Sequence, residues 1–364
     1  MTLEEFAAYA EGFAREHGEP GTLSLRHLQR LVAGKGPKGQ PLGPIRPATA
    51  RLLERIFETD SSDLLSSPMQ AVAPPDDDAA ELRERIQKAK RVDAGMLQSL
   101  RGQLNSIRRT DRQFGAIVTH TEVLARISQV RDLFTYSLTV TTRRELAILL
   151  SEMHTLAGWQ ALDTGHRSVS WRHYEEAKQA ALETEEISYH VHATAEQAFT
   201  LIDLNYTTTA VHLLESTLRA AERRCPQLLR AWLVAAHGET LAADRQPDQS
   251  RKQFDEAEHQ LPRESVPKEG PYIVLDRNHL TRWRGHSVSQ SDRVGSFSLL
   301  TNALKGLDPT FIRAESALRV DLASALIALH EIDKASGQLD KASKMAYNLG
   351  SIRQLRRISA LRTV

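Results

Sequence analysis

Histidine is the residue type whose spacing in this chain most resembles a metal-binding or catalytic pattern. His190 and His192 form a His-x-His pair, and His154, His173 and His212 lie near them in the sequence. On a helix, side chains two positions apart point about 200° away from each other, so His190 and His192 cannot share one metal ion. We therefore expect these histidines to have structural roles.

The sequence lacks the other motifs that support catalysis. It has no Gly-x-Ser-x-Gly nucleophile motif and no His-Glu-x-x-His zinc motif. The Gly-rich run at residues 34–43 follows a helix pattern, not the strand that precedes a phosphate-binding loop. Cys225 is the one cysteine, which excludes an internal disulfide and a Cys-based zinc cluster. We predict no catalytic residue, no metal site and no cofactor, and hence a protein that is not an enzyme.

A short predicted helix, residues 25–33, carries side chains suited to reading DNA. Ser24 supplies an N-cap and Gly34 a C-cap, and Leu25, Leu28 and Leu31/Val32 share the apolar face. Arginine pairs with guanine and glutamine with adenine in the major groove, while basic side chains contact phosphates. The candidate DNA-binding residues are Arg26, His27, Gln29, Arg30, Lys35, Lys38 and Arg46.

Two further predicted helices, Leu3–His17 and Pro47–Glu58, bracket this segment. The residues expected to face inward from the second are Ala50, Leu53, Ile56 and Phe57. Residues 15–55 carry eight Arg or Lys against three Glu, a local charge of +5 in a chain whose net charge is +1. Such a basic module is typical of phosphate binding. Two alternatives stay open: a merely solvated Arg-rich face, or a remnant module that no longer binds DNA.

Composition divides the chain into residues 1–66, a linker at 67–80 and a helical region at 81–364. The linker contains Pro74-Pro75 and Asp76–Asp78, a composition that cannot bury much surface. Helix patterns in the third region begin with Glu81–Arg109, Gln113–Leu138, Thr142–Asp163 and Val169–Leu182. We expect Tyr272–Leu275, the most strand-like run, to form a loop between repeats.

A short signature recurs five times in the helical region: an aromatic residue or leucine, then a small residue three positions later. The pairs are Tyr174/Ala177, Leu214/Thr217, Phe254/Ala257, Leu300/Ala303 and Leu339/Ala342. Successive pairs are 40, 40, 46 and 39 residues apart. This period indicates stacked helix hairpins. The predicted fold class is all-α: an N-terminal helix-turn-helix module followed by an α-solenoid of tetratricopeptide-like helix hairpins.

In such superhelices the first helix of each hairpin lines the concave surface, and this places a set of aromatic and polar side chains in a groove. The candidate ligand-binding residues are Thr155, Trp159, His192, Glu196, Phe199, Trp232 and Glu239. They suit an extended peptide or a flat apolar ligand, with Glu196 or Glu239 holding a cationic group. The alternative for Trp159 and Phe199 is packing in the core between hairpins.

The C-terminal segment Ser351–Val364 is a basic amphipathic helix, expected to cap the solenoid or mediate dimer contacts, with phosphate binding as an alternative. No apolar run approaches the roughly 18 residues of a membrane helix, so we expect no membrane partner. Residues 1–10 contain Glu4 and Glu5 where a secretion signal carries basic residues. The predicted location is cytoplasmic.

Two segments resemble known families. LAGWQALDTGH, followed by YEEAKQAAL, resembles the opening repeat of tetratricopeptide-type sensor domains in actinomycete regulators. The matching positions are Gly158-Trp159, Asp163-x-Gly165, Tyr174, Ala177, Ala180 and Ala181, whereas Ser170 and Thr217 stand where that family has alanine. LSLRHLQRLVAGKG and RPATARLLERIFETDSSDLL are similar to the xenobiotic-response-element class of helix-turn-helix repressors, with Asp60–Leu65 matching the final element. The first helix of that class is apparently missing, and the loop Gly34–Pro47 is longer.

Together these features resemble quorum-sensing-type regulators whose repeat domain binds a signalling peptide or small molecule. The resemblance implies a homodimer that binds double-stranded DNA with an affinity shifted by the effector. The alternative is an interaction protein that sequesters a partner through its repeats and keeps a vestigial DNA-binding module. A weaker one is RNA or membrane-surface binding through the Arg-rich C-terminus.

Overall fold

The computed structural model describes residues 2–36, 40, 42–64, 77–262 and 270–363, and these form helices and turns without a β-strand. The chain divides into two compact units, Met1–Leu82 and Arg83–Val364. The predicted fold class, an all-α chain built largely from repeated helix hairpins, is confirmed.

The first unit consists of α1 (Leu3–Glu16), α2 (Leu25–Ala33), α3 (Pro47–Phe57) and the short α4 (Ser61–Leu64). Ser24 begins α2 by accepting a hydrogen bond from the His27 N–H, and Gly34 ends it at φ 64°. Left-handed backbone of this kind favours glycine. Helix α1 packs against both α2 and α3, with Ala10, Leu23 and Leu52 fully buried between them.

Three apolar side chains in this unit depart from the predicted faces. Leu52, not Ala50, is buried on α3. Phe57 is 47% exposed and stacks on Phe6 with ring centroids 5.3 Å apart, and Val32 is 68% exposed. The reason is the shortness of the helices: only about one side chain per turn can face a core this small.

The second unit begins within α5 (Asp77–Lys90), whose first turn lies in the predicted linker 67–80; residues 65–76 lie outside the described part of the chain. The predicted helix Glu81–Arg109 is two helices, because Asp93 caps a new start at α6. The helices that follow are α6 (Ala94–Phe114), α7 (Ala116–Tyr136), α8 (Val140–Asp163), α9 (Arg167–Leu182), α10 (Ile187–Asp203), α11 (Thr207–Ala221), α12 (Gln227–Ala243), α13 (Pro247–Gln260), α14 (Arg277–Ser289), α15 (Arg293–Lys305), α16 (Ile312–Ala328), α17 (Ile332–Leu349) and α18 (Ile352–Arg362).

The five predicted signature pairs lie on the second helices of successive hairpins, α9, α11, α13, α15 and α17, and all ten side chains are buried. In the first helix of a hairpin, a small residue faces the first side chain of the signature pair. A Cβ atom added at Gly158 would lie 2.9 Å from the Tyr174 ring, and one at Gly238 would lie 2.9 Å from the Phe254 ring. Close backbone approach of this kind fixes where the two helices of a hairpin cross.

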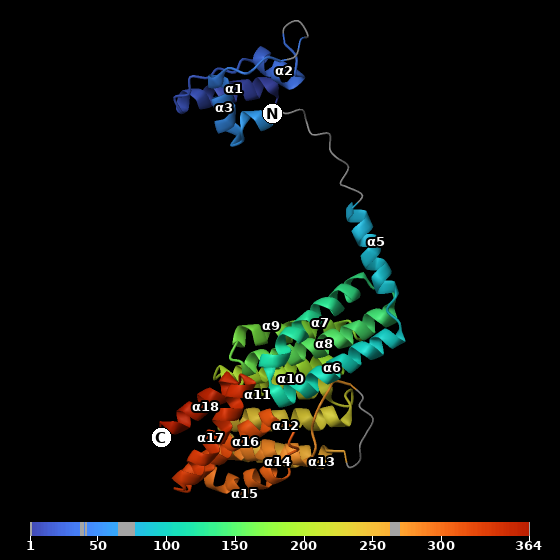
Figure 1. Ribbon diagram of the computed structural model, residues 1–364, viewed down its shortest axis with the longest axis vertical. Helices are drawn as coiled ribbons and strands as arrows, with labels where there is room; N and C mark the ends of the chain where they lie inside the picture. The colour runs from blue at the N-terminus through green and yellow to red at the C-terminus, as the bar shows by residue number, and fades with distance from the viewer. Residues whose placement is uncertain (1, 37–39, 41, 65–76, 263–269, 364) are drawn as a thin grey trace. The chain divides into compact units, whose positions relative to one another are not determined.

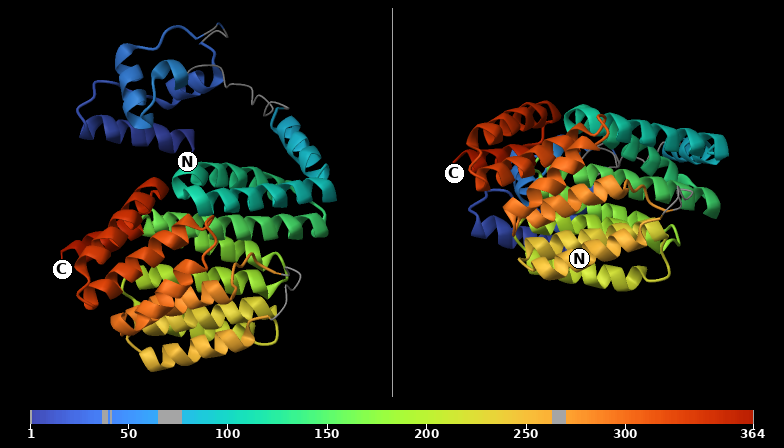
Figure 2. Two further views of the ribbon diagram at one scale, coloured as in Figure 1. Left: turned by 60° about the horizontal axis from the view of Figure 1, so that its bottom comes forward. Right: turned by 90° about the horizontal axis from the view of Figure 1, so that it is seen from below.

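The last hairpins return to the first helices of the unit. Helix α6 contacts α16 and α17, and α8 contacts α18 (Figures 1 and 2). At Gly115, where φ is 78°, an added Cβ would overlap the backbone of Leu349. The superhelix is therefore closed on itself. Helix α18, expected either to cap the solenoid or to mediate dimer contacts, packs against α8, α16 and α17.

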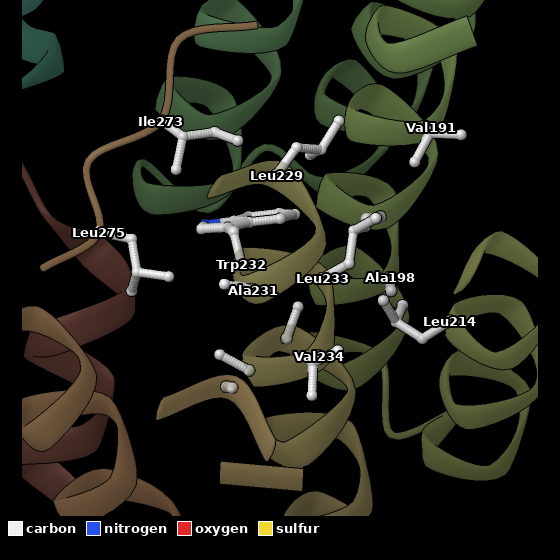
Figure 3. Packing of buried hydrophobic residues seen from close by; sticks show 14 of the residues in the cluster. Val191, Ala198, Leu214, Leu229, Ala231, Trp232, Leu233, Val234, Ile273 and Leu275 are labelled. Carbon is white, nitrogen blue, oxygen red and sulfur yellow. The ribbon is translucent and has the colours of Figure 1, made fainter. Parts of the chain in front are cut away.

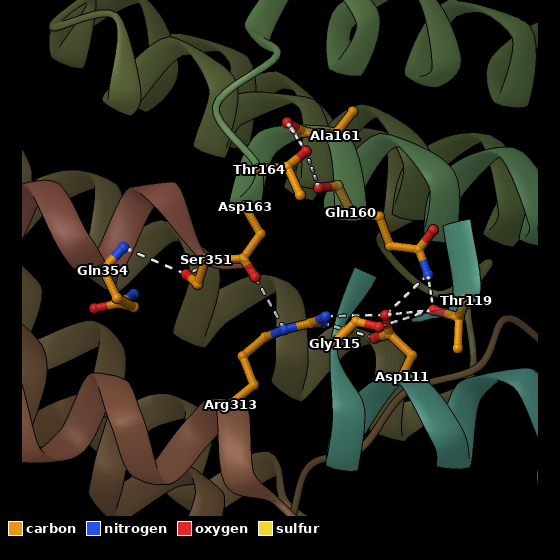
Figure 4. Close-up of polar contacts among 10 residues, drawn as sticks. All are labelled: Asp111, Gly115, Thr119, Gln160, Ala161, Asp163, Thr164, Arg313, Ser351 and Gln354. Carbon is orange, nitrogen blue, oxygen red and sulfur yellow. Dashed lines mark hydrogen bonds and ion pairs between the residues drawn. The ribbon is translucent and has the colours of Figure 1, made fainter. Parts of the chain in front are cut away.

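A polar cluster joins the two ends, and we call Asp111, Asp163, Arg313 and Ser351 the latch (Figure 4). Arg313 of α16 donates to both oxygens of Asp111 on α6, at 2.7 and 2.9 Å. Its Nε atom lies 3.1 Å from Asp163 Oδ2 on α8, and Ser351 donates to the other oxygen at 2.6 Å. Burial lowers the pKa of Arg313, but the two carboxylates outweigh it and raise the pKa above its usual value.

Candidate functional sites

A cavity of about 580 Å³ lies within the repeat unit. Its walls come from α6, α8, α10, α12, α14, α16 and α18 and from residues 272–275. All seven residues predicted from the sequence line it: Thr155, Trp159, His192, Glu196, Phe199, Trp232 and Glu239. They meet because the first helices of the hairpins lie side by side, and residues spaced by three, four or seven share a helix face.

Four rings from three helices form one side of the cavity, and we call His192, Phe199, Trp232 and Trp283 the aromatic wall. The Trp232 ring lies 4.9 Å from His192, 6.4 Å from Phe199 and 5.9 Å from Trp283, measured between ring centroids. Phe199 and Trp232 also belong to the core between hairpins, so the two interpretations weighed for Phe199 both apply. Sequence reasoning missed Trp283, although it follows Trp232 on the next first helix.

A loop supplies the rest of the apolar surface. Figure 3 shows Ile273 and Leu275 beside Trp232, on the side away from Leu233. The Tyr272 N–H donates to Glu152 at 2.8 Å, and the Arg108 guanidinium lies 4.2 Å from the Tyr272 ring centre. The predicted loop between repeats is thus confirmed as irregular backbone. Its place in the cavity wall was missed, although an apolar run in a loop is a signal of burial.

Most carboxylates in the cavity wall are neutralised by arginine. Arg313 serves Asp111 and Asp163, and the others pair as Arg108–Glu152 at 2.9 Å, Arg353–Asp203 at 3.6 Å and Arg357–Asp321. Burial alone would raise the pKa of Asp321, but Arg357 and His286 hold it well below its usual value. These pairs account for five of the seven acidic side chains that line the cavity.

Within the described part of the chain, the two remaining carboxyl groups, Glu196 and Glu239, form ion pairs with histidines alone. His192 Nε2 lies 3.7 Å from Glu196 Oε1, and His286 Nε2 lies 3.8 Å from Glu239 Oε1. Both separations exceed a hydrogen bond. Burial, with Glu239 adding to it and Arg353 opposing it, raises the pKa of Glu196 to about 8. Burial and the nearby Arg108 lower the pKa of His192 to about 3, so this ring is neutral and provides no counter-charge.

Three arginines of the cavity wall, Arg112, Arg282 and Arg356, form no ion pair within the described part of the chain. Arg282 makes no ion pair or hydrogen bond with any described residue, and its Nε atom is buried. Burial lowers its pKa, whereas Glu239 and Asp321 raise it from a distance. Arg282 was not predicted from the sequence, where it is one arginine among many.

The predicted DNA-binding residues lie on and near α2. Arg26, Gln29, Arg30, Lys35 and Arg46 are exposed, and His27 is half-buried. Lys38 lies outside the described residues. Neither Arg26 nor Arg30 forms an ion pair within the described part of the chain. The charged face of α2 is thus turned to solvent, as the pattern predicted.

The fold brings two of the histidines singled out in the sequence into contact. His154 and His173 contact each other, with their Nδ1 atoms 3.0 Å apart, and Arg131 lies 3.0 Å from His154. Burial lowers the pKa of His154 to about 3, and both His173 and Arg131 add to the shift. No group of three or more histidine, cysteine or acidic side chains among the described residues is arranged to bind a metal.

No described helix has the length and apolar character needed to cross a membrane. Comparison of the chain with protein-family models, curated proteins and solved structures gave no match. Inference about function therefore rests on the cavity and on the exposed face of α2.

Proposed function

We propose that this protein is a DNA-binding transcriptional regulator whose repeat unit binds a small effector in the cavity. The observation that carries the proposal is a cavity of drug-ligand size in whose wall Glu196, Glu239 and Arg282 lie outside the arginine–carboxylate ion pairs. The family resemblance adds homodimerisation and a cytoplasmic location to the proposal.

Size and polarity both support a small ligand. Ligand sites commonly enclose about 300–1,000 Å³ and combine apolar walls with a few polar groups, and 580 Å³ lies within this range. Burying an ionisable group without a partner costs stability, which a ligand with complementary groups offsets on binding.

Closure of the superhelix disfavours the alternative of a sequestering protein. Such a protein needs an open concave surface along which a partner can lie. Here the latch joins α6 and α8 to α16 and α18, and the first helices face an internal cavity. A small molecule or short peptide fits this geometry better than a folded partner.

The face of α2 supports DNA as the second partner. Its exposed side chains include the two types that read bases through paired hydrogen bonds, and Lys35 and Arg46 lie nearby for phosphate contacts. A dimer would present two such helices to half-sites separated by about one helical turn, roughly 34 Å.

The DNA part is tested by gel shift with duplexes from upstream of the protein's own gene and with random duplex, at two salt concentrations. Arg30→Ala or Gln29→Ala should cost about 1–3 kcal/mol and relax preference at one base position. Lys35→Ala should weaken binding to all duplexes alike and reduce the salt dependence.

Lys341→Ala is the matched control, because it removes one exposed positive charge from the repeat unit. It should leave DNA affinity unchanged. Equal affinities for the wild type and all three α2-region variants, or an equal loss in Lys341→Ala, would refute the assignment of α2.

A further inference from the structure

The charged side chains of the cavity wall fall into two groups: those in arginine–carboxylate ion pairs and those outside such pairs. Removing the arginine–carboxylate pairs leaves two carboxyl groups, Glu196 and Glu239, and three arginines, Arg112, Arg282 and Arg356. Arg356 is exposed and Arg112 lies over the Phe311 ring, whereas the Nε atom of Arg282 is buried. Glu239 is only 7% exposed.

The two carboxyl groups also share helix faces with the aromatic wall. Glu196 lies between His192 and Phe199 on α10, four residues after the first and three before the second. Glu239 lies seven residues, about two turns, after Trp232 on α12. Rings and carboxyl groups therefore border the same space. Aromatic faces and carboxylates attract the same chemical group, a desolvated organic cation.

We propose that the effector is an organic cation, with an ammonium or guanidinium group held by Glu196 and Glu239 and an apolar body packed on the aromatic wall. This inference rests on the proposed effector site and adds the chemical class of its ligand. An anion is disfavoured beside the aromatic wall, because Glu196 and Glu239 form no ion pair with an arginine within the described residues, whereas Arg282 lies in the field of Glu239 and Asp321.

The cavity volume limits the body of this ligand. At about 30 Å³ for each water molecule, 580 Å³ is the space of roughly 20 waters. The ligand should therefore have on the order of 20 non-hydrogen atoms, the size of a modified amine, a short peptide or a dye-labelled diamine.

Three probes built on one fluorophore test the charge requirement with the full-length chain. Dansylcadaverine is a cation, its N-acetyl derivative is neutral, and dansyl-6-aminohexanoic acid is an anion of similar size. Affinity is measured by dansyl emission and by quenching of tryptophan. We expect the cation to bind on the order of tenfold more tightly than either of the others.

Isosteric variants locate the binding group. Glu196→Gln and Glu239→Gln should each weaken binding of the cation on the order of tenfold and leave the neutral probe unchanged. Glu122→Gln, on the exposed face of α7, is the matched control and should change neither. Thermal unfolding of each variant checks that the fold is retained.

Calorimetry in two buffers at pH 7 provides a readout that loss of folding cannot imitate. Glu196 is faced by Tyr174 of α9, His192 of α10, Glu239 of α12 and Arg353 of α18. Its raised pKa means that the free protein holds a proton there, and a bound cation should release it. Release of up to one proton is expected for the wild type and none for Glu196→Gln.

Each outcome decides the inference. Tenfold preference for the cation, lost in the two glutamine variants, supports it. Equal affinity for cationic and neutral probes, tighter binding of the anion, or no binding of the cation overturns it. Binding of the neutral or anionic probe would still leave the proposed effector site standing, and the gel shift on the same preparation tests DNA binding separately.

Discussion

Two pairs of acidic side chains line the same cavity, and they differ in whether an arginine pairs with them. Asp111 and Asp163 share Arg313, which bonds the first at 2.7 and 2.9 Å and lies 3.1 Å from the second. Among the described residues, Glu196 and Glu239 form no ion pair with an arginine, although seven arginines line the cavity. The first pair holds helices together, and the second pair is left for another partner.

The two pairs also differ in the ionisation of their groups. In the latch, opposite charges outweigh burial and keep Arg313 protonated. At Glu196, burial and the like charge of Glu239 outweigh Arg353, so that the carboxyl group stays protonated at neutral pH. Ion pairing thus offsets burial at the latch, whereas burial is not offset at Glu196, and three substitutions measure the contrast.

The largest effect is expected for Arg313→Ala. It leaves two buried carboxylates without a counter-charge, which costs about 3–5 kcal/mol of unfolding free energy. The four tryptophans, Trp159, Trp171, Trp232 and Trp283, all lie in the repeat unit, so tryptophan fluorescence during urea unfolding reports this unit alone.

Arg319→Ala is the matched control on the same helix. Arg319 pairs with Glu315 one turn away at 2.6 Å and donates to Gln338 of the next helix, α17, at 2.6 Å, so its contacts stay within one hairpin. Its loss should cost about 1–2 kcal/mol, because it removes local hydrogen bonds and leaves no pair of buried carboxylates behind. Similar losses for the two variants would show that the latch has no special role in stability.

An intermediate effect is expected from Glu196→Gln and depends on pH. The folded pKa of about 8 lies above the usual 4.5, so the folded state holds an extra proton, and stability falls as pH rises from 4.5 to 8. His154, His173 and His192 have folded pKa values of about 3, 4 and 3, so their contribution is lost as pH falls below 6.5. The three histidines dominate below pH 6.5, and Glu196 dominates above it.

The wild type should therefore be most stable near pH 6.5 and lose about 2 kcal/mol by pH 8. Glu196→Gln should keep the acid limb and lose the decline above pH 6.5, as measured by urea unfolding at several pH values. An unchanged decline in the variant would mean that Glu196 is ionised in the folded protein at neutral pH, and would weaken the contrast with the latch.

The smallest effect is expected for Ser351→Ala, which removes one hydrogen bond to Asp163 and leaves Arg313 in place. The substitution should cost about 1–2 kcal/mol of unfolding free energy. The Ser351 hydroxyl donates to a charged carboxylate, and the same side chain caps α18. Ser289→Ala is the control, since Ser289 bonds only a carbonyl of its own helix. A loss in Ser351→Ala no larger than in this control would exclude a role for the hydroxyl in the latch.

Some residues of the cavity and the latch could be predicted from the sequence, and others could not. Glu196, Trp232 and Glu239 were found because the 40-residue period places them on equivalent faces of first helices. Arg282 and Trp283 were missed because the step to the fourth hairpin is 46 residues, and the extra residues shift the register. Asp111 and Arg313 are 202 residues apart and carry no local signal of their pairing.

Closure by the latch bears on how the repeat unit unfolds. In an open array each hairpin contacts only its neighbours, so unfolding starts at a free end and spreads by one hairpin at a time. Here α6 contacts α16 and α17, so neither end is free to fray. The contacts between ends can form only after most of the intervening chain is ordered, which slows folding and makes it more cooperative. A local change within the cavity is therefore felt by the whole closed chain of helices, not by one hairpin alone.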